Sequence, residues 1–212
     1  MFELDGISVL KHSSIKIKKQ EIIYIDPFQI DIPAHDADLI LCTHSHYDHF
    51  SPEDIRAVAN ENTILIVTED CKNDVYKTGI NEERIHYTKP NEQIQFEEVV
   101  IETIPAYNKT KEYHPKSKNW VGYLIHIDGF IYYIAGDTDK TKEACSVKCD
   151  VAFLPVGGTY TMNYIDAASL VQKIKPKYVI PTHYGSIVGE PEDGILFKEL
   201  IDGKDTKCEI YY

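Results

Sequence analysis

Short apolar segments rich in Ile, Val and Tyr recur along the chain and predict a protein built mainly from β-strands. Each segment has the length of a strand, and clusters of Gly, Pro, Asp or Lys separate it from the next. The Asp128-Gly129 pair favours a hairpin turn between two of them. The predicted strands are Ile7–Leu10, Ile15–Lys18, Glu21–Asp26, Leu39–Thr43, Thr63–Thr68, Val99–Pro105, Val121–Ile127, Phe130–Ala135, Val151–Pro155, Tyr178–Pro181 and Cys208–Tyr211.

Helical signals are fewer. Ser51 is a typical N-cap residue, and Pro52 behind it suits the first position of a helix, so a helix is expected to begin there. Further helices are expected over Asp70–Thr78, Ile165–Lys175 and Leu196–Ile201, each followed by a Gly or Pro that ends it. A few helices among many strands indicate sheets packed in layers with the helices outside.

Composition narrows the class of protein. A hydrophobic fraction of 43% and a charged fraction of 26% over 212 residues are ordinary for a soluble globular chain. The net charge of −12 disfavours nucleic acid as a partner, because binding to phosphates depends on Lys and Arg. No apolar run approaches the roughly 20 residues that cross a bilayer. The start of the chain lacks the pattern of a signal peptide, and five scattered cysteines form no framework. We therefore expect a cytoplasmic protein without a membrane partner.

The segment His44-Ser45-His46-Tyr47-Asp48-His49 is the strongest chemical signal in the sequence. It follows an apolar strand directly and offers four potential metal ligands. His44 and His46, two residues apart in an extended segment, share a face and can converge on one ion. Asp48 and His49 can reach a second ion. Imidazole and carboxylate groups suit zinc and similar divalent metals.

Two later segments place further ligand types at strand ends. Asp137 stands in Gly136-Asp137-Thr138, on a glycine turn after a predicted strand, where its carboxylate could bridge two ions. Taken alone, a turn aspartate that caps backbone N–H groups is the other interpretation. His183, in Pro181-Thr182-His183-Tyr184-Gly185, follows another strand, and a single histidine there would more often be structural.

The HxHxDH pattern, the later Gly-Asp-Thr and the late Pro-Thr-His-Tyr-Gly together resemble the metallo-β-lactamase superfamily, from about His12 to Gly185. Within it the sequence looks like the branch that includes L-ascorbate-6-phosphate lactonases and N-acyl-phosphatidylethanolamine phospholipase D. The resemblance implies an α/β fold, the αββα four-layer sandwich of metallo-β-lactamase type. It also implies that residues 1–212 form a single domain of this type.

Carried over residue by residue, the family pattern implies a binuclear metal site. His44 and His46 would bind the first ion, Asp48, His49 and His183 the second, and Asp137 both. Asp48 and Asp137 are also the expected catalytic residues. The implied cofactor is two Zn²⁺ ions, with Mn²⁺, Fe²⁺ or Ni²⁺ as other occupants of the same ligands.

The sequence departs from the family pattern at the third ligand of the first ion. The family commonly has a histidine after a phrase like Ile104-Pro105-Ala106-Tyr107, and this chain has Asn108 there. His114 lies six residues further on and could reach back from the loop. We favour His114 as the ligand over a weaker or absent one.

Other residues have candidate supporting roles. Asp26, which ends a strand before Pro27, is expected to hydrogen-bond a metal-binding histidine, although a simple turn aspartate fits equally well. Tyr184 and His12 are candidate proton donors to the leaving group, and packing or hydrogen bonding alone is the more frequent role of each type. His35, His86 and His126 have no ligand context, and Cys145 and Cys149 lack partner ligands.

The function implied is a metal-dependent, zinc-containing hydrolase that cleaves a small ester, lactone or phosphodiester. Two divalent ions about 3.5–4 Å apart would provide a bridging hydroxide as the nucleophile. A non-catalytic metal-binding or sensor domain, and a small nuclease or phosphodiesterase, are the alternatives. The expected partner is a small-molecule substrate that can be anionic, and a homo-oligomer is compatible with the sequence.

Overall fold

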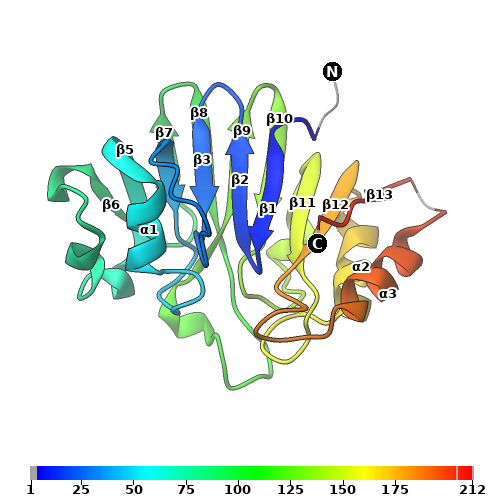
Figure 1. Ribbon diagram of the computed structural model, residues 1–212. Helices are drawn as coiled ribbons and strands as arrows, with labels where there is room; N and C mark the ends of the chain where they lie inside the picture. The colour runs from blue at the N-terminus through cyan, green and yellow to red at the C-terminus, as the bar shows by residue number, and fades with distance from the viewer. Residues whose placement is uncertain (1–3, 204, 212) are drawn as a thin grey trace. The chain divides into compact units, whose positions relative to one another are not determined.

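Two mixed β-sheets organise the protein, one in each of two units (Figure 1). The computed structural model describes residues 4–203 and 205–211. The amino-terminal unit extends to Thr88, and the carboxy-terminal unit begins at Lys89. Each sheet combines antiparallel strands at one side with parallel strands at the other. In each unit the antiparallel strands come first in the sequence and the parallel strands follow.

The amino-terminal sheet has six strands in the order β1-β2-β3-β4-β5-β6. The first three form antiparallel pairs, and β3 to β6 are parallel. The described residues of this unit form one α-helix, α1 (Pro52–Val58), which begins after Ser51, whose side chain accepts from the N–H of Asp54. The strands are β1 (Ile7–Lys11), β2 (Ser14–Lys18), β3 (Ile22–Ile25), β4 (Ala37–Leu41), β5 (Ala59–Thr68) and β6 (Ile85–Thr88).

The core of the amino-terminal unit lies between α1 and one face of its sheet. Ile40 of β4 and Leu65 of β5 are buried there together with Ile55 of the helix. Residues of the other face, such as Ile23 and Leu39, are also buried. Strand β4 is therefore apolar on both sides, which explains its nearly continuous hydrophobic sequence.

The carboxy-terminal sheet has seven strands in the order β13-β12-β11-β10-β9-β8-β7. Strands β7 to β10 pair antiparallel, and β10 to β13 are parallel. Helices α2 (Tyr164–Ile174) and α3 (Glu192–Ile201) pack on it through buried residues such as Leu170 and Phe197. The strands are β7 (Gln93–Phe96), β8 (Val99–Pro105), β9 (Val121–Ile127), β10 (Phe130–Ile134), β11 (Val151–Pro155), β12 (Tyr178–Thr182) and β13 (Lys207–Cys208).

The structure differs from the expected elements in the segment 70–78 and at three strands. The segment from Asp70 to Thr78 is not one α-helix but two short 3₁₀ helices, η1 (Glu69–Cys71) and η2 (Val75–Thr78). Strands β6 and β7 were not predicted, and β13 is shorter than the expected Cys208–Tyr211. The Asp128-Gly129 hairpin between β9 and β10 is confirmed, with both residues at positive φ, as a type I′ turn requires.

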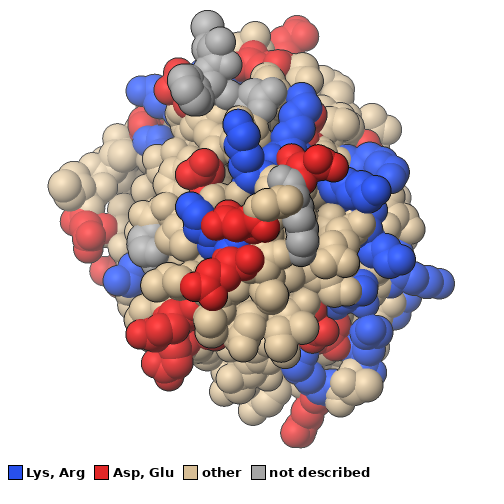
Figure 2. Space-filling model, turned by 90° about the vertical axis from the view of Figure 1, so that its right-hand side faces the viewer, with Lys and Arg blue, Asp and Glu red and all other residues tan. Residues whose placement is uncertain are grey.

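The surface around α2 and α3 carries both signs of charge (Figure 2). Basic side chains gather along the right-hand side of this view and acidic ones towards the left. Exposed apolar side chains lie among them, namely Ile165 of α2 and Ile195, Leu196 and Leu200 of α3. No helix among the described residues has the length and apolar content needed to span a bilayer.

Truncating Ile40 to Ala tests the core that supports β4. Ile40 is completely buried, so Ile40→Ala leaves a cavity and should lower the free energy of unfolding by about 2–5 kcal/mol in urea titrations. Ile32 is 80% exposed, and Ile32→Ala should change it by less than about 0.5 kcal/mol. Equal losses in the two variants would contradict the burial described for β4.

Candidate metal centre

In the amino-terminal unit, the candidate residues follow three strands that run in the same direction. Strand β1 is antiparallel to β2, β2 is antiparallel to β3, and β3 is parallel to β4. The carboxyl ends of β1, β3 and β4 therefore lie at one edge of the sheet. His12 follows β1, Asp26 follows β3, and the segment His44–His49 follows β4.

The carboxy-terminal unit repeats this arrangement. Strands β8, β10 and β12 share one direction, because β9 is antiparallel to β8 and β10 while β11 is parallel to β10 and β12. The loop from Asn108 to His114 follows β8, Asp137 follows β10, and His183 directly follows β12. Side chains distant in sequence thus reach one sheet edge.

Asp26 organises the amino-terminal cluster through a buried hydrogen-bond network. One oxygen accepts from the Thr43 backbone N–H at 2.7 Å, and the other accepts from the Thr43 hydroxyl at 2.8 Å. Nδ1 of His49 lies 2.7 Å from the second oxygen. Burial raises the pKa of Asp26, and the contacts with His49 and Thr43 act in the opposite direction. The contact expected between Asp26 and a candidate ligand histidine is present.

The same network fixes which ring nitrogens carry protons. The Thr43 hydroxyl donates to Asp26, so it accepts from Nδ1 of His44 at 3.0 Å. Nδ1 of His49 donates to the Asp26 carboxylate. Both rings therefore carry the lone pair on Nε2, and a neutral imidazole of this form is a metal ligand.

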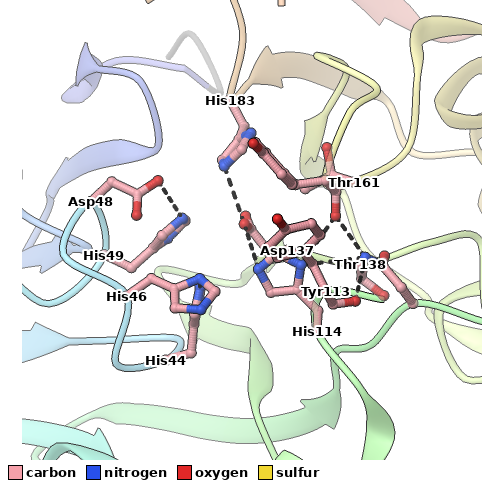
Figure 3. Close-up of polar contacts among 12 residues, drawn as sticks. His44, His46, Asp48, His49, Tyr113, His114, Asp137, Thr138, Thr161 and His183 are labelled. Carbon is pink, nitrogen blue, oxygen red and sulfur yellow. Dashed lines mark hydrogen bonds and ion pairs between the residues drawn. The ribbon is translucent and has the colours of Figure 1, made fainter. Parts of the chain in front are cut away.

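Two groups of donor atoms result in this unit (Figure 3). Nε2 of His44 lies 3.0 Å from Nδ1 of His46. In the second group, Oδ2 of Asp48 lies 3.5 Å from Nε2 of His49. His44 and His49 are buried, whereas His46 is half-buried. The four candidate ligands of the segment thus lie in two pairs.

Asp137 is the centre of the carboxy-terminal cluster. Its Oδ2 atom lies 3.1 Å from Nε2 of His114 and 3.1 Å from Nε2 of His183 (Figure 3). All three side chains are buried. The backbone packs closely here, since a Cβ at Gly157 would lie 2.2 Å from the His183 carbonyl oxygen. One carboxylate oxygen is therefore shared by two imidazoles from different segments.

Asn108 closes the loop that carries His114. Its side-chain N–H groups donate to the carbonyl oxygens of Tyr113 at 2.9 Å and Tyr160 at 2.7 Å, and its backbone N–H donates to the His114 carbonyl oxygen at 2.8 Å. Nδ1 of His114 lies 3.1 Å from the Tyr160 carbonyl oxygen, which can only accept. The structure therefore brings His114, rather than Asn108, to Asp137 through its Nε2 atom.

These donor sets fit a metal ion. With the proton of His114 on Nδ1, its Nε2 lone pair faces an Asp137 carboxylate oxygen at 3.1 Å. Two lone pairs at this distance repel one another unless a proton or a cation lies between them. Imidazole nitrogen and carboxylate oxygen are ligands of zinc and similar divalent ions.

The remaining predicted residues fall outside these clusters, with one exception. Tyr184 belongs to the hydrophobic core that includes α3, and burial raises its pKa to about 12. His126 pairs with Glu102, and His35 and His86 are exposed. The exception is His12, which lies in the amino-terminal cluster. The supporting roles of Thr43 and of the Tyr160 carbonyl were not predicted, because no motif marks them.

Comparison with known proteins finds relatives that match most of the chain. A family model for the β-lactamase superfamily domain matches residues 6–183. A UPF0173 metal-dependent hydrolase of Pyrococcus furiosus is 32% identical, in a match that covers 93% of this chain and 92% of the relative. The match with the archaeal protein therefore extends over nearly the whole of both chains.

Solved structures agree on the fold. A candidate metal-dependent hydrolase of Parabacteroides distasonis has a TM-score of 0.80 at 30% identity, covering 96% of this chain and 91% of that one. CmlA, a diiron β-hydroxylase of Streptomyces venezuelae, has a TM-score of 0.75 at 13% identity, covering 96% of this chain and 52% of its own. The expected metallo-β-lactamase fold class is confirmed. The chain belongs to the β-lactamase superfamily and, within it, to the UPF0173 family of metal-dependent hydrolases.

Proposed function

We propose that this metal-dependent hydrolase uses two divalent ions to cleave a small ester, lactone or phosphodiester. We propose that its chemistry resembles that of the branch that includes L-ascorbate-6-phosphate lactonases and N-acyl-phosphatidylethanolamine phospholipase D. His44, His46 and His114 would hold one ion, Asp48, His49 and His183 would hold the other, and Asp137 would contribute to both. We also propose that residues 1–212 act as a single metallo-β-lactamase-like domain.

The contact geometry of Asp137 carries the proposal. Its Oδ2 atom lies 3.1 Å from the Nε2 atoms of both His114 and His183, two histidines assigned to different ions. A carboxylate shared in this way suits a bridging ligand in a two-metal site. The separation of the His44 and His46 pair from the Asp48 and His49 pair, within one segment, also favours two ions.

Two bound divalent cations would lower the pKa of a water molecule and polarise the carbonyl or phosphoryl oxygen of a substrate. The chain's own groups provide order around them. Asp26 and the Tyr160 carbonyl hold protons on Nδ1 of His49 and His114, so that Nε2 remains the donor. Asp48 and Asp137 are the proposed catalytic carboxylates, and Asp137 would also orient the attacking water.

Zinc is the proposed metal because imidazole and carboxylate ligands suit it. The same ligands accept Mn²⁺, Fe²⁺ or Ni²⁺, since selectivity among these ions depends on geometry and availability as well as on affinity. CmlA, which has the same fold, is a diiron protein. Iron is therefore a candidate occupant beside zinc, and metal analysis of the purified protein distinguishes the two.

The proposed substrate is small and can be anionic. Two divalent cations outweigh the charges of Asp48 and Asp137, so the centre is locally positive within a chain of net charge −12. The loops 107–120 and 157–162 are the proposed substrate walls. They contact each other through Asn108 and Tyr160, and the rings of Tyr113 and Tyr160 lie 4.7 Å apart.

Metal titration with parallel hydrolysis assays tests the function. The metal-stripped protein should bind about two equivalents of Zn²⁺, and hydrolysis of bis-p-nitrophenyl phosphate, p-nitrophenyl acetate or a simple lactone should appear as the second binds.

Asp137→Ala should abolish hydrolysis and reduce bound metal to about one equivalent or less, with circular dichroism unchanged. Asp31→Ala, at an exposed aspartate, is the matched control and should behave as wild type. Two bound ions with no turnover of any of these substrates would favour the sensor alternative.

Separate substitutions at His114 and Asn108 test the assignment of the third ligand. His114→Ala should remove about one equivalent of metal, because it deletes the donor. Asn108→Ala should keep two equivalents at saturating metal but weaken binding by about 10–100-fold, because it loosens the loop that holds His114. Plasma mass spectrometry and chelator competition measure both. Loss of one equivalent in Asn108→Ala alone would reverse the assignment.

A further inference from the structure

His12 occupies the turn between β1 and β2, in the amino-terminal cluster. Its side chain is completely buried, and its Nε2 atom lies 3.3 Å from Oδ2 of Asp48. The ligand atoms of His12, Asp48 and His49 all lie within 4.8 Å of one another. His12 therefore reaches the same donor group as the two residues proposed to hold the second ion.

The spacing of these donors matches that of ligands around one ion. Oδ2 of Asp48 lies 3.3 Å from Nε2 of His12 and 3.5 Å from Nε2 of His49. Ligand atoms bound to one zinc ion at about 2.0–2.2 Å, with angles of about 90–110° between the bonds, lie about 2.8–3.6 Å apart. One carboxylate oxygen thus has two imidazole nitrogens at the separation expected for a shared metal.

A direct hydrogen bond in the same cluster is clearly shorter. Nδ1 of His49 approaches the Asp26 carboxylate to 2.7 Å, within the range of charge-assisted bonds. The contact of His12 with Asp48 is 3.3 Å and is close to that of the proposed ligand His49. The position of His12 thus resembles that of His49 as a ligand more than that of a residue that only hydrogen-bonds Asp48.

The backbone of His12 provides an independent observation. Its φ of 54° is left-handed, a conformation that costs free energy in a residue with a side chain. Among the described residues other than glycine with positive φ, the buried ones are His12, Asp26, His114 and His183, and the others are exposed. Such conformations concentrate at functional sites. His12 thus shares its backbone conformation with two proposed ligands and with the residue that orients His49.

We propose that His12 binds, through Nε2, the same metal ion as Asp48 and His49. This inference rests on the proposed binuclear function and adds a protein ligand to its second site. It assigns His12 to the metal instead of to proton donation, because a nitrogen bound to the metal has no proton to give to a leaving group.

Two substitutions separate a ligand from a hydrogen-bond donor. His12→Gln keeps an N–H group that can reach Asp48, and His12→Asn keeps a residue type that tolerates positive φ. His86→Gln, at an exposed histidine of β6, is the matched control. Zn²⁺ affinity of the metal-stripped proteins is measured by chelator competition, metal content by mass spectrometry, and folding by thermal unfolding in EDTA. Nitrogen-15 NMR of labelled histidines follows each ring on metal addition.

Both His12 variants should lose more affinity for the second ion than the roughly 10–100-fold that the removal of a supporting hydrogen bond costs. The wild-type His12 Nε2 resonance should shift with the second equivalent of Zn²⁺, and His86→Gln should bind as wild type. A His12→Gln variant that binds two ions within about 3-fold of wild-type affinity would overturn the inference and leave the proposed function intact. A wild-type protein that binds no second ion would overturn both.

Discussion

The common direction of three strands in each sheet is the constraint on which the candidate metal centre depends. Residues that follow β1, β3 and β4, or β8, β10 and β12, emerge at one sheet edge because the pairing of the strands fixes where each one ends. Backbone bonds extend this order just beyond the strands, from Asp26 to Leu41 and from Cys42 to Ile66. Ligands placed in this way need little further ordering when an ion binds, which favours tight binding.

Asp26 shows how the fold offsets the cost of a buried charge. Taking a carboxylate out of water costs several kcal/mol, and burial accordingly raises the pKa of Asp26. The N–H and hydroxyl of Thr43 and the ring of His49 all direct hydrogen bonds to it. The bonds around Asp26 and Thr43 also fix the tautomers of His44 and His49. Burial of the Asp26 carboxylate costs free energy of folding, but it orients two proposed ligands. A hydrophobic residue here would remove the carboxylate that accepts from Nδ1 of His49 and from the Thr43 hydroxyl.

The sequence predicts the centre of each sheet well and the margins poorly. Strands such as β4 and β11 are buried on both faces, so their apolar runs are unmistakable. The missed strands β6 and β7 and the shortened β13 are all edge strands, whose exposed positions carry polar residues. The segment 70–78 has buried residues at helical spacing, Cys71, Val75 and Thr78, but Asn73 and Asp74 interrupt it, and such side chains compete with helical backbone bonds.

The candidate site, like the fold, could be predicted from the sequence only in part. The HxHxDH segment stands out in the sequence through its own spacing, whereas Asp137 and His183 follow predicted strands and become candidate ligands through the family resemblance. The role of Asn108 was not visible, because it depends on bonds to the carbonyl oxygens of Tyr113 and Tyr160, which no residue pattern records. Comparison position by position makes Asn108 look like a lost ligand. The loop that it closes instead carries His114 to Asp137, so the six-residue shift preserves the donor while changing its support. The candidate ligands of this chain are therefore identified more reliably from their positions in the structure than from their spacing in the sequence.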